Sequence, residues 1–293
     1  MIADIVSAVV ILGGLGLLFA TILAIAYKKL HVDEDPRIGQ VEDLLPGTNC
    51  GACGEPGCRA FAEQLVISAS IPGACTVSSV EAVESIASFL GVDPGIVEKR
   101  VARLLCAGGR AEVKELVSYQ GVQRTCRMVT VVTGGNKECT WGCLGLGDCA
   151  DVCTFDAIAM NANGLPVVDI DQCTACGDCV EICPKQLFMI MPLSQKLIVQ
   201  CRSLLEGETA EKICSVACNA CGRCVVDSPP GLIEMRNNLP VIQYEKNEFA
   251  RPDSAKRCPT KAIRWIDGFQ FGNKASISFP LGRVDVSQSD QKL

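Results

Sequence analysis

The feature that most constrains this chain is a run of four closely spaced cysteines that ends in a proline. The run reads C-T-A-C-G-D-C-V-E-I-C-P, and its cysteines are Cys173, Cys176, Cys179 and Cys183. Thiolates separated by two, two and three residues are typical of [4Fe–4S] sites, in which the cysteine before the proline binds the neighbouring cluster of a pair. The run therefore predicts two iron–sulfur clusters and a chain that carries electrons.

Cysteine has two other common uses against which this run has to be weighed. Disulfide scaffolds are usually secreted chains of under about 100 residues, whereas this chain has 293 residues, of which 20 are cysteines. Structural zinc sites usually bring together two C-x2-C pairs across a longer gap. A third cysteine at the same short interval favours iron–sulfur over zinc, and zinc over disulfides.

An apolar run near the N-terminus predicts a membrane anchor. Residues 5–27 contain no charged side chain, and a helix of that length can cross the roughly 30 Å hydrocarbon layer of a bilayer. A cleaved signal peptide is the alternative, but it carries positive charge before its apolar run, whereas here Asp4 precedes the run and Lys28 and Lys29 follow it. The positive-inside rule then puts the C-terminal side in the cytoplasm.

Charge and redox chemistry limit the partners and the compartment. The formal net charge of −6 argues against nucleic acid as a partner. Reduced thiols and oxygen-sensitive clusters indicate the cytoplasm for the part that follows the anchor. We therefore expect a single-pass protein of the cytoplasmic (inner) membrane whose remaining domains lie on the cytoplasmic side.

Residues 36–105 predict a small helical domain with one cluster. Its cysteines are Cys50, Cys53, Cys58 and Cys75, of which the first three lie in N-C-G-A-C-G-E-P-G-C. Apolar residues at helical intervals predict helices before, between and after these cysteines. Asp93 and Pro94 predict the start of a further helix, as N-cap and first helical residue. A [4Fe–4S] cluster is favoured over a zinc site in this domain.

Residues 136–192, called the first repeat below, predict a two-cluster fold. An upstream run adds Cys139, Cys143, Cys149 and Cys153 to the four cysteines of the opening motif. Two strands are expected, at residues 157–160 and 165–169, around the turn N-A-N-G. In two-cluster proteins the last cysteine of each run binds the cluster of the other run, which we call the crossing rule. By this rule, one cluster takes Cys139, Cys143, Cys149 and Cys183, and the other takes Cys153, Cys173, Cys176 and Cys179.

Residues 193–265, called the second repeat, match the first in sequence but lack some of its cysteines. L-I-E-M-R-N-N-L-P-V-I-Q at residue 232 matches A-I-A-M-N-A-N-G-L-P-V-V-D at residue 157. The positions at which a cysteine is replaced are Ser228, Glu248, Arg251 and Ser254. All of these losses fall on one of two expected sites, so we expect a single cluster here. Its predicted ligands are Cys218, Cys221, Cys224 and Cys258.

Four cysteines remain outside these sets, namely Cys106, Cys126, Cys201 and Cys214. A buried free thiol is the favoured interpretation of each. Cys214 is also an alternative to Cys221 as a ligand of the second repeat. A further metal site made by several of the four is the less favoured alternative. We therefore predict four [4Fe–4S] clusters in the whole chain.

The chain is predicted to be an α+β multidomain protein with one N-terminal transmembrane helix. Its expected parts are the anchor (1–27), a linker (28–35), the helical [4Fe–4S] domain (36–105), a connecting segment (106–135), the first repeat (136–192), the second repeat (193–265) and a flexible tail (266–293). Both repeats are expected to be ferredoxin-like α+β units, with two clusters in the first and one in the second.

The order of these motifs resembles the B subunit of the Rnf complex, the ion-translocating ferredoxin:NAD oxidoreductase of prokaryotic membranes. The resemblance runs from residue 1 to about residue 265 and includes W-G-C-L-G-L-G-D-C and R-C-P-T-K-A-I. It implies that the chain takes low-potential electrons from soluble ferredoxin and passes them to other membrane subunits. The resemblance also implies that a flavin subunit and NAD accept the electrons later, and that ion movement is coupled to electron flow.

Other functions are compatible with parts of the pattern. One is an iron–sulfur subunit of another membrane oxidoreductase, of the hydrogenase or formate dehydrogenase type, and another is a membrane-tethered redox sensor without enzymatic activity. The helical domain is also similar to one in corrinoid iron–sulfur proteins, but the chain has no room for a cobamide-binding barrel. No catalytic site is expected, since His31 is the single histidine and no nucleotide-binding glycine motif is found.

Overall fold

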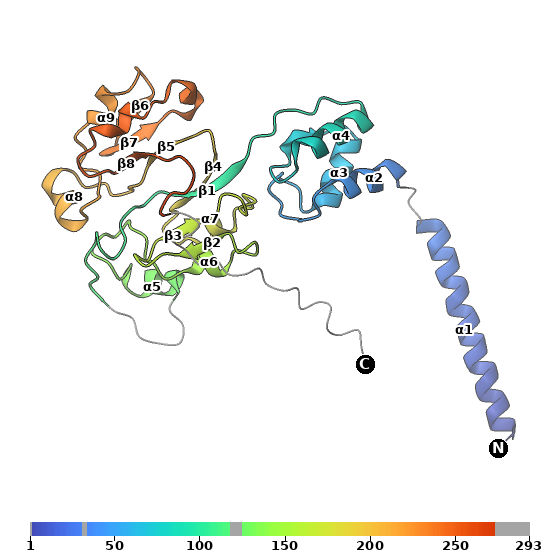
Figure 1. Ribbon diagram of the computed structural model, residues 1–293. Coiled ribbons are helices and arrows are strands. Elements are labelled where there is room, and N and C mark those ends of the chain that lie inside the picture. The colour runs from blue at the N-terminus through green and yellow to red at the C-terminus, as the bar shows by residue number, and fades with distance from the viewer. Residues whose placement is uncertain (1, 31–33, 118–124, 273–293) are drawn as a thin grey trace.

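A long apolar helix precedes the folded domains in the computed structural model, which describes residues 2–30, 34–117 and 125–272. This helix, α1 (Ile2–Leu30), stands apart from the other elements (Figure 1). Its stretch Val10–Lys29 is long and apolar enough to cross a membrane, and none of it is buried. The anchor predicted at residues 5–27 lies within this helix. His31 and the tail beyond residue 272 lie outside the described residues.

The helical domain consists of α2 (Pro36–Leu44), α3 (Cys58–Val66), the 3-10 helix η1 (Pro72–Ala74) and α4 (Val80–Leu90). Local sequence sets these bounds, since the Ser79 side chain caps the start of α4 and Gly91 ends it in the left-handed conformation. The faces that meet are apolar, with Val41, Phe61 and Ile86 fully buried between them. The helices predicted before, between and after the cysteines are confirmed.

The helix predicted from Asp93 and Pro94 is not present. Residues 93–99 have no regular secondary structure. The Asp93 carboxylate accepts a 2.7 Å hydrogen bond from the backbone N–H of Gly95, whose φ of +72° is left-handed. The Pro94 carbonyl accepts a 2.7 Å bond from the N–H of Gly73 in η1. The Asp-Pro pair therefore begins a turn, because Gly95 leaves the right-handed helical conformation and the Pro94 carbonyl is bonded to η1.

The strands of the described residues form four antiparallel pairs. The pairs are β1 (Arg100–Leu104) with β4 (Phe188–Pro192), β2 (Ile158–Met160) with β3 (Pro166–Val168), β5 (Leu197–Val199) with β8 (Ile263–Trp265), and β6 (Ile233–Arg236) with β7 (Leu239–Ile242). The β2–β3 hairpin confirms the strands predicted around N-A-N-G, and β6–β7 is its equivalent in the second repeat. Asn237 and Asn238 turn the second hairpin with φ of +49° and +64°, which asparagine tolerates.

Strand β1 belongs with the first repeat rather than with the helical domain. Arg100 stands opposite Pro192 and Leu104 opposite Phe188, so β1 pairs along its whole length with β4. Its inward side chains, including Val101, are buried in the same core as those of β2 and β3. The helical domain, expected to extend to residue 105, therefore ends before residue 100. Residues 100–104 pack with the first repeat because their partner strand, β4, lies far along the chain.

The other helices of this region are short. They are α5 (Cys126–Thr133), α6 (Asp148–Asp151) and α7 (Asp178–Ile182), then α8 (Gly207–Ile213), α9 (Arg223–Val226), the 3-10 helix η2 (Tyr244–Phe249) and α10 (Asp253–Lys256). Three of them, α6, α7 and α9, follow a left-handed glycine at the N-cap, and we call this arrangement the glycine turn. Its members are Gly147, Gly177 and Gly222, with φ of +95°, +100° and +68°. Residues with a side chain rarely adopt this conformation, and a cysteine follows two positions later in each case.

Candidate metal centres

Four cysteines of the first repeat surround a hollow of about 320 Å³. They are Cys153, Cys173, Cys176 and Cys179. Burial, and then the charges of the other three sulfurs, raise the pKa of Cys179, so the four thiols are close neighbours. The remaining walls are largely apolar and include Phe155, Ile158 and Ile190. These are the four cysteines that the crossing rule brings together.

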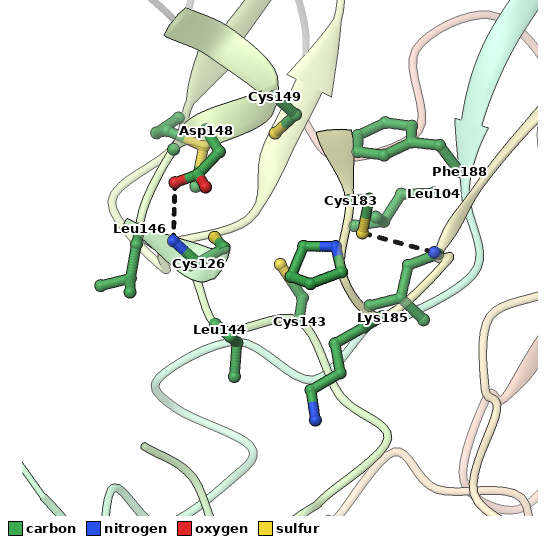
Figure 2. A pocket seen from close by; sticks show the side chains of 15 residues that line it. Leu104, Cys126, Cys143, Leu144, Leu146, Asp148, Cys149, Cys183, Lys185 and Phe188 are labelled. Carbon is green, nitrogen blue, oxygen red and sulfur yellow. Dashed lines mark hydrogen bonds between the residues drawn. The ribbon is translucent and has the colours of Figure 1, made fainter. Parts of the chain in front are cut away.

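A second hollow, of about 380 Å³, is also lined by four cysteines. They are Cys126, Cys143, Cys149 and Cys183. Figure 2 shows these side chains with Leu104 and Phe188, which contribute to the apolar wall. Cys139, which the spacing predicts in this set, is not among the lining residues. Cys126, for which no ligand role is predicted, stands in its place.

A carboxylate holds Cys126 at this hollow. One side-chain oxygen of Asp148 accepts a hydrogen bond from the backbone N–H of Cys126 at 2.7 Å (Figure 2). The other accepts one from the N–H of Arg127 at 3.2 Å. Asp148 is also the first residue of α6, the helix that carries Cys149. The start of α5 is thereby fixed to the start of α6. Because this contact joins residues 22 positions apart, the spacing inside a cysteine run does not reveal it.

A third hollow, of about 320 Å³, is lined by Cys139 together with three cysteines that the spacing leaves without a role. These three are Cys106, Cys201 and Cys214. Burial raises the pKa of Cys214 to about 12, and the charges of the other three sulfurs are among the further causes. Cys214 therefore belongs with this hollow, and it does not replace Cys221 in the second repeat.

The second repeat brings together the four cysteines expected for it. Burial, and then the charges of Cys258 and Cys221, raise the pKa of Cys224 to about 11. Burial also raises the pKa of Cys218 to about 11, with Cys224 and Cys258 among the charges that add to it. Cys221 is exposed, whereas the other nineteen cysteines are buried or half-buried. One edge of this set therefore faces solvent.

Two of the lost ligand positions of the second repeat, Ser228 and Ser254, are partly or fully buried, whereas Glu248 and Arg251 are exposed. Ser254 is 1% exposed, and its hydroxyl has no hydrogen-bond partner among the described residues. The Ser228 hydroxyl donates a 2.6 Å bond to the carbonyl oxygen of Cys224. Leu197, Leu232 and Ile263 are buried in the core of the same repeat. Apolar packing rather than a set of four cysteines therefore occupies this half of the repeat.

The helical domain collects the remaining four cysteines around its core. They are Cys50, Cys53, Cys58 and Cys75. Burial raises the pKa of Cys53, and the charges of Cys75 and Cys50 are among the smaller causes. The Asn49 side chain accepts a 2.8 Å hydrogen bond from the N–H of Cys58 and so fixes the start of α3 beside the other three. This grouping agrees with the motif.

None of these sets is tight enough for a single metal ion among the described residues. Within the described residues, no three cysteine, histidine or carboxylate side chains stand close enough together to hold one metal ion. A tetrahedral zinc with sulfurs at about 2.3 Å requires sulfur atoms about 4 Å apart, whereas a four-iron cube holds its ligands further apart. Backbone N–H groups also point at sulfur, as in the 3.4 Å bond from Leu187 to Cys183 (Figure 2). Such bonds are typical of iron–sulfur sites.

Burial makes the Cys143 thiol harder to ionise. It raises the pKa of Cys143 to about 12, so this group is a thiol at neutral pH when it stands alone. A metal ligand has to be a thiolate, and a bound cation deprotonates it. The buried Cys143 position therefore provides a thiolate only together with a positively charged metal centre.

Neighbouring sets touch one another within the first repeat. After burial and the charges of closer thiols, the charge of Cys179 contributes to the raised pKa of Cys149, which links the first and second hollows. The backbone N–H of Cys143, a residue of the second hollow, donates a 3.4 Å hydrogen bond to the sulfur of Cys106 in the third. These three hollows therefore form an unbroken row.

Two further contacts extend the row at its ends. The backbone N–H of Cys218, in the second repeat, donates a 3.3 Å hydrogen bond to the sulfur of Cys201 in the third hollow. The Thr76 hydroxyl, next to Cys75 of the helical domain, donates a 3.1 Å bond to the carbonyl of Thr174 beside the first hollow. Five sets of four cysteines thus follow one another from the helical domain to the second repeat.

Two family models match parts of the chain. The one described as "Putative Fe-S cluster" matches residues 45–77, which contain the four cysteines of the helical domain. The one described as "4Fe-4S binding domain" matches residues 165–188, which contain the run that ends in Cys183. The two matches cover separate parts of the row of cysteine sets.

Three proteins are similar to the chain over most of its length, and each is the B subunit of a membrane oxidoreductase complex. That of the Na(+)-translocating ferredoxin:NAD(+) oxidoreductase complex of Acetobacterium woodii is 40% identical over 90% of this chain and 78% of its own. That of the ion-translocating oxidoreductase complex of Methanosarcina acetivorans is 36% identical over 90% of this chain and 99% of its own. That of the proton-translocating ferredoxin:NAD(+) oxidoreductase complex of Clostridium ljungdahlii is 36% identical over 89% of this chain and 93% of its own. The similarity thus extends over several domains rather than one motif.

Proposed function

This chain belongs to the B-subunit family of ion-translocating ferredoxin:NAD(+) oxidoreductases, the Rnf complexes, and we propose that its cysteine sets bind [4Fe–4S] clusters that relay electrons from soluble ferredoxin toward the membrane. The chain is a membrane-associated electron-transfer subunit of such a complex. The electron donor, the ligands of each cluster and the direction along the chain are the proposed part of this function.

Four clusters are proposed on four of the cysteine sets. Their ligands are Cys50, Cys53, Cys58 and Cys75 in the helical domain, then Cys153, Cys173, Cys176 and Cys179, then Cys126, Cys143, Cys149 and Cys183, and finally Cys218, Cys221, Cys224 and Cys258. The third of these sets contains Cys126 where the spacing predicts Cys139. The lining of the second hollow supports this exchange.

The observation that carries the proposal is the contact between neighbouring sets. Cys149 and Cys179 belong to different sets, yet the charge on one sulfur acts on the other. The hydroxyl of Thr76 binds the carbonyl of Thr174, so the helical domain is docked beside the first hollow. Sites that bind metal for structure alone have no need to lie close together. Sites that pass electrons from one to the next have to be close enough for the electron to cross the gap.

The residues of the chain would bind, bury and tune each centre. A bound [4Fe–4S] cluster supplies a one-electron couple whose potential depends on burial, on hydrogen bonds to sulfur and on nearby charge. Leu104 and Phe188 exclude water from the second hollow, and the N–H of Leu187 stabilises negative charge on the sulfur of Cys183. The chain itself makes and breaks no covalent bond in this role.

The anchor determines which end of the row faces the bilayer. The helix α1 ends at Leu30 and α2 begins at Pro36, so the connection spans at most about 20 Å. The helical domain is therefore held near the membrane, whereas the second repeat lies at the opposite end of the folded part (Figure 1). We propose that electrons enter at the second repeat, where Cys221 is exposed, and leave through the helical domain to other subunits.

Orientation follows from the charges that flank the anchor. Lys28 and Lys29 occupy the last turn of α1, and the positive-inside rule puts such residues on the cytoplasmic side of the inner membrane. The helical domain and both repeats, which we regard as ferredoxin-like units, then share a compartment with soluble ferredoxin. The coupling ion named for the relatives differs between sodium and protons, and nothing in the cysteine sets selects between them.

Reduction of the purified full chain by ferredoxin tests this function. The chain is purified in detergent without oxygen, and iron, acid-labile sulfide and zinc are measured. We expect equal iron and sulfide, and electron paramagnetic resonance signals of reduced [4Fe–4S] clusters after addition of pre-reduced ferredoxin. Zinc without sulfide would overturn the electron-transfer function. Clusters that dithionite reduces but reduced ferredoxin does not would overturn the proposed donor.

A further inference from the structure

The third hollow contains a complete set of four cysteines that no sequence motif groups together. Its members come from three parts of the chain: Cys106 follows β1, Cys139 lies in the first repeat, and Cys201 and Cys214 lie in the second. The four side chains are between 6% and 9% exposed. The hollow has the same volume of about 320 Å³ as the one lined by the C-x2-C-x2-C run. Its other walls include Val113 and Trp141.

The backbone around this hollow donates hydrogen bonds to two of the sulfurs and approaches a third closely. The sulfur of Cys106 accepts a hydrogen bond from the N–H of Cys143, and the sulfur of Cys201 accepts one from the N–H of Cys218, at 3.4 and 3.3 Å. Gly108 lies so close that a Cβ on it would stand 3.2 Å from the Cys214 sulfur and 2.9 Å from Val113. A close backbone approach and N–H donors are what cluster sulfurs require.

A buried cation beside the hollow is a second, independent observation. Lys137 is 5% exposed, its ammonium donates a 3.1 Å hydrogen bond to the carbonyl of Gly108, and no ion pair within the described residues includes it. Its charge acts on both Cys106 and Cys139. Burying an ammonium is unfavourable unless negative charge lies nearby. Glu115 pairs with Lys137 through the backbone, but its carboxylate accepts a hydrogen bond from Asn136. A cluster with four thiolate ligands is an anion and would supply that charge.

Two simpler roles for these cysteines fit less well. Free buried thiols need neither a shared hollow nor N–H donors, and four of them around one apolar space would leave that space poorly packed. A single zinc ion requires a tighter group than any that the described residues form. The same considerations that support clusters in the first two hollows therefore apply to the third.

We propose that a fifth [4Fe–4S] cluster is bound by Cys106, Cys139, Cys201 and Cys214. The proposal rests on the iron–sulfur function above and extends it. The site lies between the set that contains Cys143 and the set that contains Cys218. It bridges the two repeats and closes the gap between the exposed end of the row and the first repeat. Every cysteine of the chain is then a ligand.

The metal content of the full chain tests the number of clusters. Five clusters correspond to about 20 iron and 20 sulfide per chain, and four correspond to about 16 of each. The intact mass of the anaerobic protein, measured under native conditions, makes the same distinction without any substitution. About 20 supports the fifth site, and about 16 overturns it while leaving the relay function in place. Zinc without sulfide overturns both.

Two variants locate the cluster at the third hollow. Cys201→Ala and Cys214→Ala each remove one ligand of this set alone. Each is expected to lower iron by about four per chain, or by about one with the signal of an oxidised [3Fe–4S] cluster. Val216→Ala changes a side chain that lines the same hollow but leaves all four sulfurs, and it should keep the wild-type content. Unchanged iron in both cysteine variants overturns the site; if neither variant folds, the wild-type count decides.

Discussion

The hydroxyl of Thr76 donates a 3.1 Å hydrogen bond to the backbone carbonyl of Thr174, across 98 positions of the chain. Thr76 follows the last cysteine of the helical domain, and Thr174 follows the first cysteine of the C-x2-C-x2-C run. The contact therefore joins the two domains directly beside a cysteine of each. The irregular segment 93–99 is the covalent connection between the same two domains.

Thr76→Val should loosen the docking of the helical domain while leaving the cysteine sets intact. The variant removes one partly buried hydrogen bond, which is worth about 1 kcal/mol. We expect faster hydrogen exchange, or faster proteolysis, at residues 93–99, with unchanged iron content. Thr76→Ser keeps the hydroxyl and serves as the control. Equal exchange rates in the valine variant and in the wild type would show that the bond does not hold the domains together.

Double variants should reveal which cysteines share a centre. Cys126→Ala and Cys149→Ala remove ligands of the same hollow, so the pair should lose no more iron than either single variant, about four per chain. Cys139→Ala with Cys149→Ala should lose about eight, because these two cysteines line different hollows. Iron and sulfide analysis of the purified variants checks both expectations. A loss of only about four irons from the Cys139 and Cys149 double variant, with no loss from Cys126→Ala alone, would restore the grouping that the spacing of the run predicts.

Asp148→Ala should weaken the attachment of α5 to the first repeat. The carboxylate accepts the N–H groups of Cys126 and Arg127, and losing such a helix cap costs about 0.5–2 kcal/mol. We expect the midpoint of thermal unfolding to fall by a few degrees, about 2–4 °C for a domain of this size. Asp43→Ala, at an exposed position of α2, should leave the midpoint unchanged. A shift of the same size in both variants would contradict the capping role.

The two serines at lost ligand positions should respond to alanine in opposite directions. The Ser254 hydroxyl is buried without a partner among the described residues, so Ser254→Ala should raise the free energy of unfolding by about 1 kcal/mol. The Ser228 hydroxyl donates to the Cys224 carbonyl, so Ser228→Ala should lower it by a similar amount. Denaturant unfolding of the two variants provides matched measurements. Destabilisation by Ser254→Ala would mean that its hydroxyl has a partner.

Local sequence determined much of the fold. The helix bounds around Ser79 and Gly91 follow from caps, and the β2–β3 hairpin follows from alternating apolar residues around N-A-N-G. These signals lie within a few residues of the structure they specify. The turn at Asp93 was not predictable in the same way, since Gly95 adopts a left-handed φ and the Pro94 carbonyl is bonded to Gly73, which lies far before it in the chain.

The grouping of the cysteines was likewise predictable only where their positions in the chain are close. Sets whose members lie close in sequence, such as Cys173, Cys176 and Cys179, were predictable from spacing. The exchange of Cys126 for Cys139 was not, because it depends on the hydrogen bonds that Asp148 makes to the start of α5. The third hollow needs the two repeats to be docked before its cysteines meet. The number of unassigned cysteines was the one signal in the sequence. Cys126 completes the set of the second hollow, and Cys106, Cys201 and Cys214 form the set of the third hollow with Cys139.

The glycine turn has a consequence for the ancestry of the second repeat. A duplicated two-cluster unit would carry this turn four times, two positions before the third cysteine of each run. Gly147, Gly177 and Gly222 keep it, whereas the fourth position is Pro252, with a φ of −57°.

Proline cannot adopt a left-handed φ, so the loss at this position extends to the backbone as well as to the ligands. Returning cysteine to positions 228, 248, 251 and 254 would therefore not rebuild the missing site while Pro252 remains. The backbone still shows the repeated glycine turn in the other three runs. In this half of the second repeat, restoring the cysteines one by one would not restore the site.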